Sequence, residues 1–213
     1  MSEHTGIAVI ESKWFPKSNV SVRGLFELVA DLAIGSPHAY HYEMASSEAA
    51  LKEAIPRIAK YQSCRYLCLA MHGSEKGLYV INDERVTRTE LRNMLVKIKR
   101  TRGAKLSGIH LATCLFGTEE MAAKLFSTKT DVAWIAGYSE EVDWIRSSAL
   151  DLLFFNHLAN LRSAQLTELQ KIYSVVAMLK DTAAGLMREL GFGVFVRKQK
   201  TGGAKNLIED LQT

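Results

Sequence analysis

The stretch Leu106–Gly117, LSGIHLATCLFG, predicts the central strand of the fold and carries the residue on which the chemistry depends. Gly108–Thr113 is a short apolar run next to Ser107, which is typical of a strand covered on both faces. Cys114 follows this strand directly and precedes a helix expected over about Thr118–Ser127. A thiol close to a helix N-terminus ionises readily, and the thiolate is the nucleophilic form. A single cysteine is more often a small buried apolar residue, so Cys114 indicates a catalytic site only together with a partner.

A second strand of the same kind supplies that partner. Arg65–Met71, RYLCLAM, is another compact apolar run, and His72-Gly73 follows it directly. Histidine is the usual general base, and glycine lets the backbone approach a substrate carbonyl closely. Open α/β sheets bind their ligands at the C-terminal ends of the strands. Two adjacent parallel strands would therefore bring His72 and Cys114 together, although they stand 42 positions apart.

These two motifs resemble the caspase-like fold shared by caspases, gingipains, legumains, separases and CHAT-domain peptidases. The resemblance covers roughly Ile7–Leu161. The stretch Ile135–Leu158 looks like the CHAT branch, in which the strand after the cysteine leads through a polar segment into a helix with an aromatic pair near its end. Here that pair is Phe154-Phe155.

The resemblance implies a His-Cys dyad. Cys114 would attack a peptide carbonyl, and His72 would take up the thiol proton and later donate a proton to the leaving amine. The backbone N–H groups of Gly73 and Cys114 would hold the oxyanion. The residues after the cysteine depart from the family pattern, because Leu115-Phe116-Gly117 stands where caspases have Arg-Gly and CHAT proteins commonly have Ser-Gly. This departure concerns the substrate class more than the dyad.

Two sets of charged residues are candidates for substrate binding. Glu141 and Asp143 follow the strand Val132–Gly137, where family members that cleave after basic residues carry an acidic pocket residue. A carboxylate there would pair with Arg or Lys at the residue before the cut. Arg23 is the competing candidate, because caspases use an arginine in this region to bind aspartate. An acidic loop and a helical arginine are also typical of an ordinary solvated surface.

The order of the elements predicts an α/β protein. Apolar strands alternate with amphipathic helices, which is typical of a three-layer, doubly wound and mostly parallel sheet with helices on both faces and a flavodoxin-like winding. The strands are expected at Gly6–Ile10, His38–Met44, Arg65–Met71, Gly108–Thr113, Val132–Gly137 and Gly191–Val196, with a hairpin at Gly77–Ile81 and Arg85–Val86. The first helix is expected at about Val22–Ile34, with Ser21 as its cap and Leu32 among the residues of its core face. A second helix is expected from Ser46 or Ser47, and Pro56 should kink or split it. The other helices are expected at about Thr89–Arg100, Thr118–Ser127, Trp144–Leu161 and Thr167–Leu190. Residues 1–213 are expected to form one domain, with a polar tail from about position 198.

The composition of the chain argues against several classes of binding partner. Lys+Arg 27 against Asp+Glu 23 gives a net charge of only +4, which does not indicate a nucleic-acid partner. Three cysteines form no disulfide scaffold, and we expect a reducing cytoplasm. Neither terminus has a signal-peptide pattern and no apolar run has membrane-spanning length, so neither secretion nor membrane association is expected. Cys64 and Cys68 are not a C-x-x-C pair and no phosphate-binding loop follows a strand, so we expect no metal and no cofactor.

The sequence thus predicts a cysteine endopeptidase that cleaves a partner protein. Compact forms of this type resemble prokaryotic stress or antiviral defence effectors. Because 213 residues leave no room for a separate sensor domain, an activating protein partner is expected outside the chain. The main alternative is a catalytically inactive caspase-like protein-binding module. A flavodoxin-like nucleotide or signalling domain is a weaker one, since it gives no reason for His72 and Cys114 to end neighbouring strands.

Overall fold

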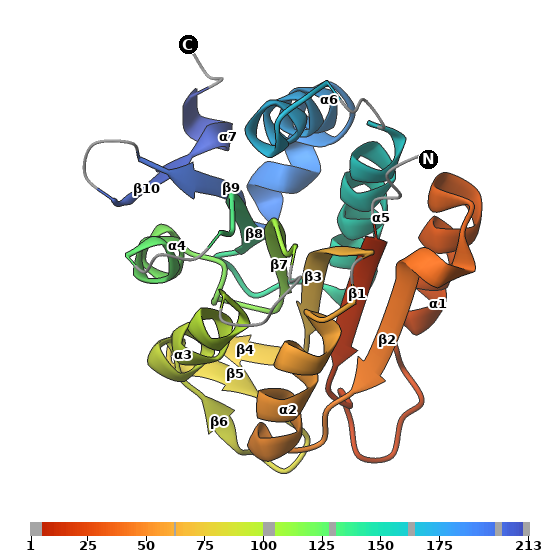
Figure 1. Ribbon diagram of the computed structural model, residues 1–213, viewed down its shortest axis with the longest axis vertical. Coiled ribbons are helices and arrows are strands. Elements are labelled where there is room, and N and C mark those ends of the chain that lie inside the picture. The colour runs from red at the N-terminus through yellow and green to blue at the C-terminus, as the bar shows by residue number, and fades with distance from the viewer. Residues whose placement is uncertain are drawn as a thin grey trace.

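The computed structural model describes residues 6–61, 63–99, 105–127, 131–161, 165–198 and 202–210 (Figure 1). Its main sheet has seven strands in the order β10-β9-β8-β7-β3-β1-β2. The five strands from β2 to β8 in this order are parallel. At one edge β9 is antiparallel to β8, and β10 is antiparallel to β9. The strands of this sheet are β1 Gly6–Glu11, β2 Tyr40–Met44, β3 Cys64–Ala70, β7 Gly108–Ala112, β8 Trp134–Tyr138, β9 Phe192–Arg197 and β10 Ala204–Asn206.

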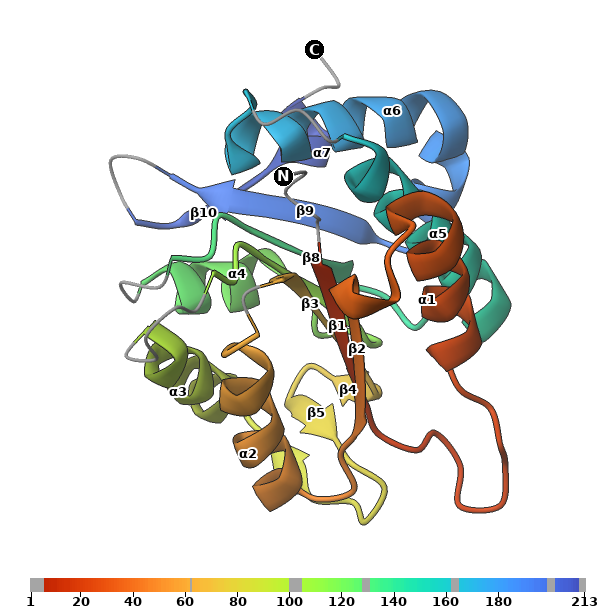
Figure 2. The ribbon, with the colours of Figure 1, turned by 45° about the vertical axis from the view of Figure 1, so that its right-hand side comes forward.

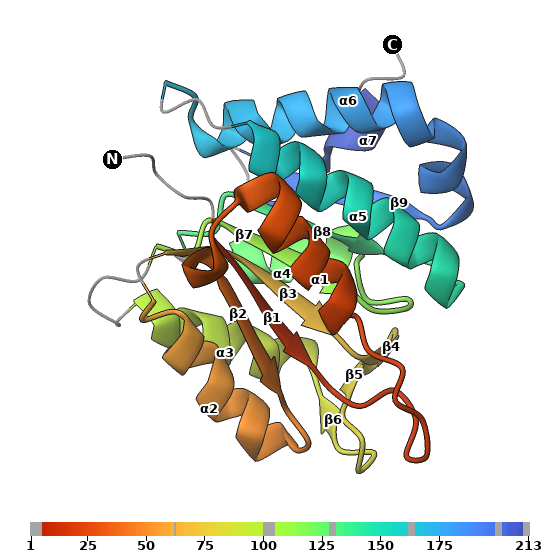
Figure 3. The same ribbon diagram turned by 90° about the vertical axis from the view of Figure 1, so that its right-hand side faces the viewer.

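Helices cover both faces of the sheet, as Figure 3 shows. One face is covered by α1 Arg23–Val29, α5 Trp144–Asn160 and α6 Glu168–Glu189. The other face is covered by α2 Glu48–Ile58, α3 Arg88–Lys99 and α4 Glu119–Phe126. The predicted three-layer α/β architecture with its flavodoxin-like strand order is thereby confirmed.

The alternation of side chains along the strands divides the core into two clusters. In β1, Ile7 and Val9 pack toward α1, α5 and α6, whereas Ala8 and Ile10 pack toward α2, α3 and α4. All four residues are buried, because both faces of a parallel sheet are covered. This double burial explains why the strands appear in the sequence as continuous apolar runs.

The strand order reverses between β1 and β3. From β1 the chain crosses to β2 on one side, and from β3 it crosses to β7 and β8 on the other. The loops that leave β1 and β3 therefore diverge and open a crevice at the C-terminal ends of these strands. A second, three-stranded sheet lies beyond this end (Figure 3) and consists of β4 His72–Ser74, β5 Gly77–Tyr79 and β6 Arg85–Val86.

Several local predictions were wrong. Pro56 does not split its helix: it lies in the last turn of α2, which ends two residues later at Ile58. Ser21 is not the N-cap residue of α1: the N-cap is Val22, and the Ser21 hydroxyl, one position earlier, accepts a hydrogen bond from the Arg23 N–H at 3.1 Å. Leu32, expected on the core face, is 78% exposed because the helix continues from Ala30 to Ile34 as a π-helical turn, which rotates the side chains around the axis.

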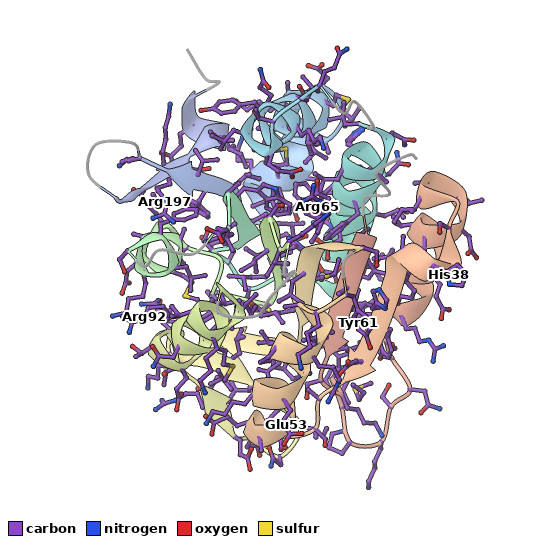
Figure 4. All side chains as sticks on the ribbon, in the orientation of Figure 1. His38, Glu53, Tyr61, Arg65, Arg92 and Arg197 are labelled. Atoms are coloured by element: carbon purple, nitrogen blue, oxygen red, sulfur yellow. The ribbon has the colours of Figure 1, made fainter. Side chains whose placement is uncertain are left out.

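The C-terminal segment adds regular structure where a polar tail was expected. β10 pairs with β9, and the short helix α7, Leu207–Asp210, follows it beside α6 (Figure 2). At the end of β9, Arg197 reaches α4 (Figure 4), where its guanidinium lies over the Phe126 ring at 5.2 Å and donates to the Phe126 carbonyl. The expected helix end at Arg100 lies outside the described residues.

Candidate active site

The loops that follow β1, β3, β7 and β8, together with the first two turns of α5, enclose a cavity of about 140 Å³ at the C-terminal end of the sheet. The loops after β1 and β3 belong to it, so the cavity lies at the reversal of strand order. It is smaller than the roughly 300–1,000 Å³ typical of pockets for drug-sized ligands, and it suits a single side chain. The residues that line it are Trp14, Phe15, Val22, His72, Ala112, Thr113, Cys114, Tyr138, Val142, Trp144, Ser147, Ser148 and Asp151.

The structure brings His72 and Cys114 to this one cavity. His72 is exposed in β4, two residues beyond the end of β3, and Cys114 is half-buried in the turn after β7. Gly73 packs against this turn so closely that a Cβ atom built on it would lie 2.4 Å from the Cys114 carbonyl oxygen. Only glycine fits there without a shift of the backbone.

His72 is held by the loop that follows β1. Its Nε2 atom lies 2.7 Å from the Trp14 carbonyl oxygen, and its ring makes edge contacts with the rings of Trp14 and Phe15 at 5.4 and 5.6 Å. A carbonyl oxygen can only accept a hydrogen bond, so Nε2 carries a proton. In the neutral ring Nδ1 is then the acceptor, which is the form that a general base needs.

The turn that carries Cys114 has a constrained backbone. Leu115 adopts the left-handed conformation at φ 58°, and its N–H donates to the Glu140 carbonyl at 3.1 Å. Gly117 N–H donates to the Tyr138 carbonyl at 2.8 Å. Within the described residues the Cys114 N–H donates to no backbone acceptor, which leaves it available to an incoming oxyanion.

The helix that follows Cys114 begins too far along the chain for its N-terminus to act directly on the thiol. Thr118 is the N-cap of α4 and accepts a hydrogen bond from Met121 N–H, and the first helical residue is Glu119. The favourable field of a helix N-terminus acts mainly within the first turn. Activation of the Cys114 thiol would therefore depend on His72.

The other two cysteines lie in the interior of the sheet. Cys64 and Cys68 are fully buried in β3. Burial raises the pKa of the Cys64 thiol to about 12 and raises the pKa of Cys68 well above its usual value. Because burial disfavours the reactive thiolate, we expect both thiols to react far more slowly than an exposed thiol at neutral pH.

Asp151 forms the floor of the cavity and was not identified from the sequence. It lies on α5 with only 3% of its surface exposed. Its Oδ1 atom accepts hydrogen bonds from the Nε2–H of His110 at 2.7 Å and from the hydroxyl of Tyr138 at 2.5 Å. No hydrogen bond from the described residues reaches Oδ2. One signal was available: Asp151 is a charged residue within the apolar face of the helix formed by Leu150, Phe154, Phe155 and Leu158.

Tyr138 contacts Asp151 as a neutral hydrogen-bond donor. Burial, followed by the carboxylate charge, raises the pKa of Tyr138 well above its ordinary value, so Tyr138 remains a neutral donor. His110 is surrounded by the rings of Phe154, Phe155 and Phe192, and its Nδ1 atom has no hydrogen-bond partner in the described structure. A ring protonated on Nε2 alone leaves no buried N–H without an acceptor.

Two further polar atoms at the cavity lack a partner. Thr113 Oγ1 and Trp144 Nε1 are buried, and neither makes a hydrogen bond within the described residues. Buried polar groups are normally satisfied, so unsatisfied ones beside a cavity indicate space for a ligand with donors and acceptors.

The substrate-binding residues predicted from the sequence lie outside the cavity lining. Asp143 is the N-cap of α5, and its side chain accepts a hydrogen bond from Arg146 N–H at 2.9 Å. Glu141 is exposed in the same loop, next to Val142, which does line the cavity. Arg23 is exposed, bonded to Glu27 at 2.7 Å and stacked on the Tyr42 ring at 5.3 Å.

A larger cavity of about 360 Å³ lies between α6, β9 and α7. Its charged lining consists of Lys180, Arg188 and Glu209, and it contains no cysteine or histidine. In the described segments we find no group of three His, Cys, Asp or Glu side chains that could hold a metal ion. None of the helices in those segments is long and apolar enough to cross a membrane.

Comparison with known proteins finds similarity among solved structures. No protein-family model matches the chain, and no curated protein matches it. The chain is similar to an inactive zymogen C11 protease from Parabacteroides distasonis, with a TM-score of 0.46 and 12% sequence identity. The similarity covers 91% of this chain and 62% of that protein. A similarity of this size carries no argument about function.

Proposed function

We propose that this chain is a cysteine endopeptidase of the caspase-like, CHAT-related type, with Cys114 as nucleophile and His72 as general acid and base. One observation carries the proposal. A histidine whose ring is oriented by the Trp14 carbonyl lines the same cavity as the half-buried thiol of Cys114, at the reversal of strand order. Nucleophile, base and an orienting group for the base are the three parts that covalent catalysis requires.

The reaction proceeds in two halves. Cys114 transfers its thiol proton to His72, and the thiolate attacks the scissile carbonyl carbon. The resulting oxyanion is bound by the N–H groups of Cys114 and Gly73, a type of contact in which one donor contributes roughly 3–4 kcal/mol in other hydrolases. The tetrahedral intermediate collapses to a thioester, and the leaving amine takes the proton from His72. Water then gives a proton to His72, attacks the thioester and releases the carboxylic acid with the regenerated thiol.

The side chain before the cut would enter the cavity and meet Asp151. The Asp151 carboxylate accepts two hydrogen bonds through Oδ1, and none from the described residues reaches Oδ2. A lysine or arginine side chain would supply a cation and place its aliphatic stem against Val142 and Trp144. The exposed carboxylates of Glu141 and Asp143 would add negative charge near the entrance. An alternative preference for acidic substrates, with Arg23 as the binding residue, would require Arg23 to leave Glu27.

The proposed substrate is a partner protein, and the proposed setting is a prokaryotic stress or antiviral defence response in the cytoplasm. All three cysteines are free thiols, which agrees with a reducing compartment. An activating protein partner is part of the proposal. The alternative is a catalytically inactive binding module, favoured by the unusual Leu115-Phe116-Gly117 turn.

The test compares cleavage of a mixed peptide library by wild type, Cys114→Ala and His72→Ala. We expect wild type to cut and both variants to lose at least about 100-fold in rate. If wild type leaves the library intact, an electrophilic peptide-like probe distinguishes the two remaining cases. Rapid labelling of Cys114 indicates a competent enzyme that awaits its activator, whereas an unlabelled Cys114 favours the binding module.

A further inference from the structure

The last residue of β1, Glu11, is a wholly buried carboxylate that takes no part in the proposed chemistry. Its Oε1 atom accepts hydrogen bonds from the indole Nε1–H of Trp14 at 2.6 Å and from the Val22 N–H at 2.9 Å. Its Oε2 atom accepts from the hydroxyls of Ser21 and Tyr42, both at 2.5 Å. A buried charge is stable only with such a set of donors, and hydrogen bonds to a carboxylate are among the strongest in proteins.

Three of these donors belong to the loop between β1 and α1, residues 12–22, and they hold its two ends against the same carboxylate. Trp14 lies near its start, and Ser21 and Val22 lie at its end. Figure 3 shows this long loop beside β4. Only one backbone hydrogen bond links two residues within the loop, from Ser18 N–H to the Phe15 carbonyl at 3.2 Å. The shape of the loop therefore depends on Glu11 more than on regular secondary structure.

Trp14 connects this carboxylate to the candidate base. Its indole N–H donates to Glu11, while its carbonyl oxygen accepts from His72 Nε2 at 2.7 Å. Its ring also packs edge-on against the imidazole, with an interplanar angle of 79°. A shift of Trp14 would move two of the three groups that contact the His72 ring, the third being the Phe15 ring.

We propose that Glu11 is a positioning residue that holds His72 in its base-competent orientation through Trp14. The inference rests on the proposed function, since it requires that His72 act on Cys114. Glu11 fixes the Trp14 ring, the ring fixes the peptide that carries the carbonyl, and the carbonyl keeps the proton on Nε2. In a catalytic triad a carboxylate orients its histidine directly. Here the carboxylate acts through one intervening residue.

Two substitutions interrupt this connection at different points. Glu11→Gln removes the charge and replaces one acceptor oxygen by an NH₂ group. Trp14→Phe deletes the indole N–H but retains an aromatic ring and the backbone carbonyl that His72 uses. We expect each to lower kcat about tenfold or more on the peptide that wild type cuts best, with KM changed less than about threefold. The rate of Cys114 alkylation by iodoacetamide should fall toward that of His72→Ala.

The double variant gives the decisive measurement. If Glu11 acts through Trp14, adding Glu11→Gln to Trp14→Phe lowers kcat and the alkylation rate no further. Tyr42→Phe is the matched control, because it removes another donor of the same carboxylate on the β2 side. Tyr42→Phe should lower the thermal stability but leave kcat and the alkylation rate within about twofold of wild type. Circular dichroism confirms that each variant is folded before rates are compared.

The possible failures are distinguishable. Additive effects in the double variant, or a loss in Tyr42→Phe equal to that in Trp14→Phe, would mean that Glu11 has a general structural role and would overturn the inference. If His72→Ala slows alkylation of Cys114 while Glu11→Gln and Trp14→Phe do not, the inference alone fails and the dyad stands. If His72→Ala leaves alkylation unchanged, the dyad itself is rejected, and the positioning role with it.

Discussion

The backbone of Gly73 lies directly against the carbonyl oxygen of Cys114. A Cβ atom at position 73 would stand 2.4 Å from this oxygen and 2.9 Å from Thr113 Cβ. The two short motifs identified in the sequence are therefore in van der Waals contact. The absence of a side chain on Gly73 allows the strand that carries His72 to approach the turn that carries Cys114.

Gly73→Ala should consequently separate the two motifs. We expect a destabilisation of about 1–3 kcal/mol, because the new methyl group must displace backbone atoms, and at least a tenfold loss of peptidase activity. Gly24→Ala is the matched control, since a Cβ at that helical position meets no atom within 4 Å. It should be neutral or slightly stabilising. Thermal unfolding and peptide cleavage measure both effects, and equal results for the two variants would contradict the packing argument.

The three cysteines should differ sharply in reactivity. Burial raises the pKa of Cys64 to about 12 and that of Cys68 well above its normal value, whereas Cys114 is half-buried at the cavity. At pH 7.5 iodoacetamide should modify Cys114 at least about 100-fold faster than either buried thiol in the folded protein. Peptide mapping by mass spectrometry after short exposure gives the three rates. In denaturant the three rates should converge.

Leu115 tests the backbone geometry beside the nucleophile. A left-handed conformation is costly for a residue with a Cβ and still more costly for a β-branched residue. Leu115→Ile changes the branching but not the volume, and we expect it to destabilise the protein by roughly 1–2 kcal/mol. Leu115→Gly should come close to wild-type stability, because glycine adopts this conformation freely. Denaturant unfolding measures both, and a fully stable Leu115→Ile would show that the turn readily rearranges.

The preference for the residue before the cut should depend on Asp151. Asp151→Asn keeps the shape of the side chain but removes the charge, and we expect cleavage after Lys or Arg to fall at least about tenfold relative to cleavage after Leu. Asp143→Asn, two helical turns earlier, distinguishes the two carboxylates, since asparagine still caps the helix. A larger loss of basic preference in Asp143→Asn would assign the recognition of the cation to the helix start instead.

Acidification should weaken the fold through partly buried histidines. Burial lowers the pKa of His41 and His157 below the ordinary value of 6.5. The unfolded chain therefore binds protons at a higher pH than the folded chain, and stability declines as the pH falls from about 6.5 through the lowered folded-state pKa values. His157→Gln removes one of these groups. The difference in Tm between pH 7.5 and pH 5.5 should be smaller in His157→Gln than in wild type, and an unchanged difference would exclude His157 as a contributor.

Local residue patterns were sufficient to predict the order of elements. Continuous apolar runs such as Arg65–Met71 indicate strands covered on both faces, and Thr118 and Thr167 cap their helices through their own side chains. Both signals arise within a few residues of chain, so the sequence alone shows them. The failures at Ser21, Leu32 and Pro56 are local too, and each depends on how a helix begins, turns or ends.

The sequence by itself determined that a His-Gly pair and a cysteine follow two buried strands of a parallel α/β sheet. Only the tertiary structure decided what surrounds them. The Trp14 carbonyl meets His72 across 58 positions, and Asp151 meets His110 across 41. These contacts join the ends of different strands and helices, so they follow from strand order and crossover geometry rather than from local patterns. Glu11 illustrates the same point: a lone carboxylate at a strand end is ordinary in the sequence, and the fold surrounds it with four donors.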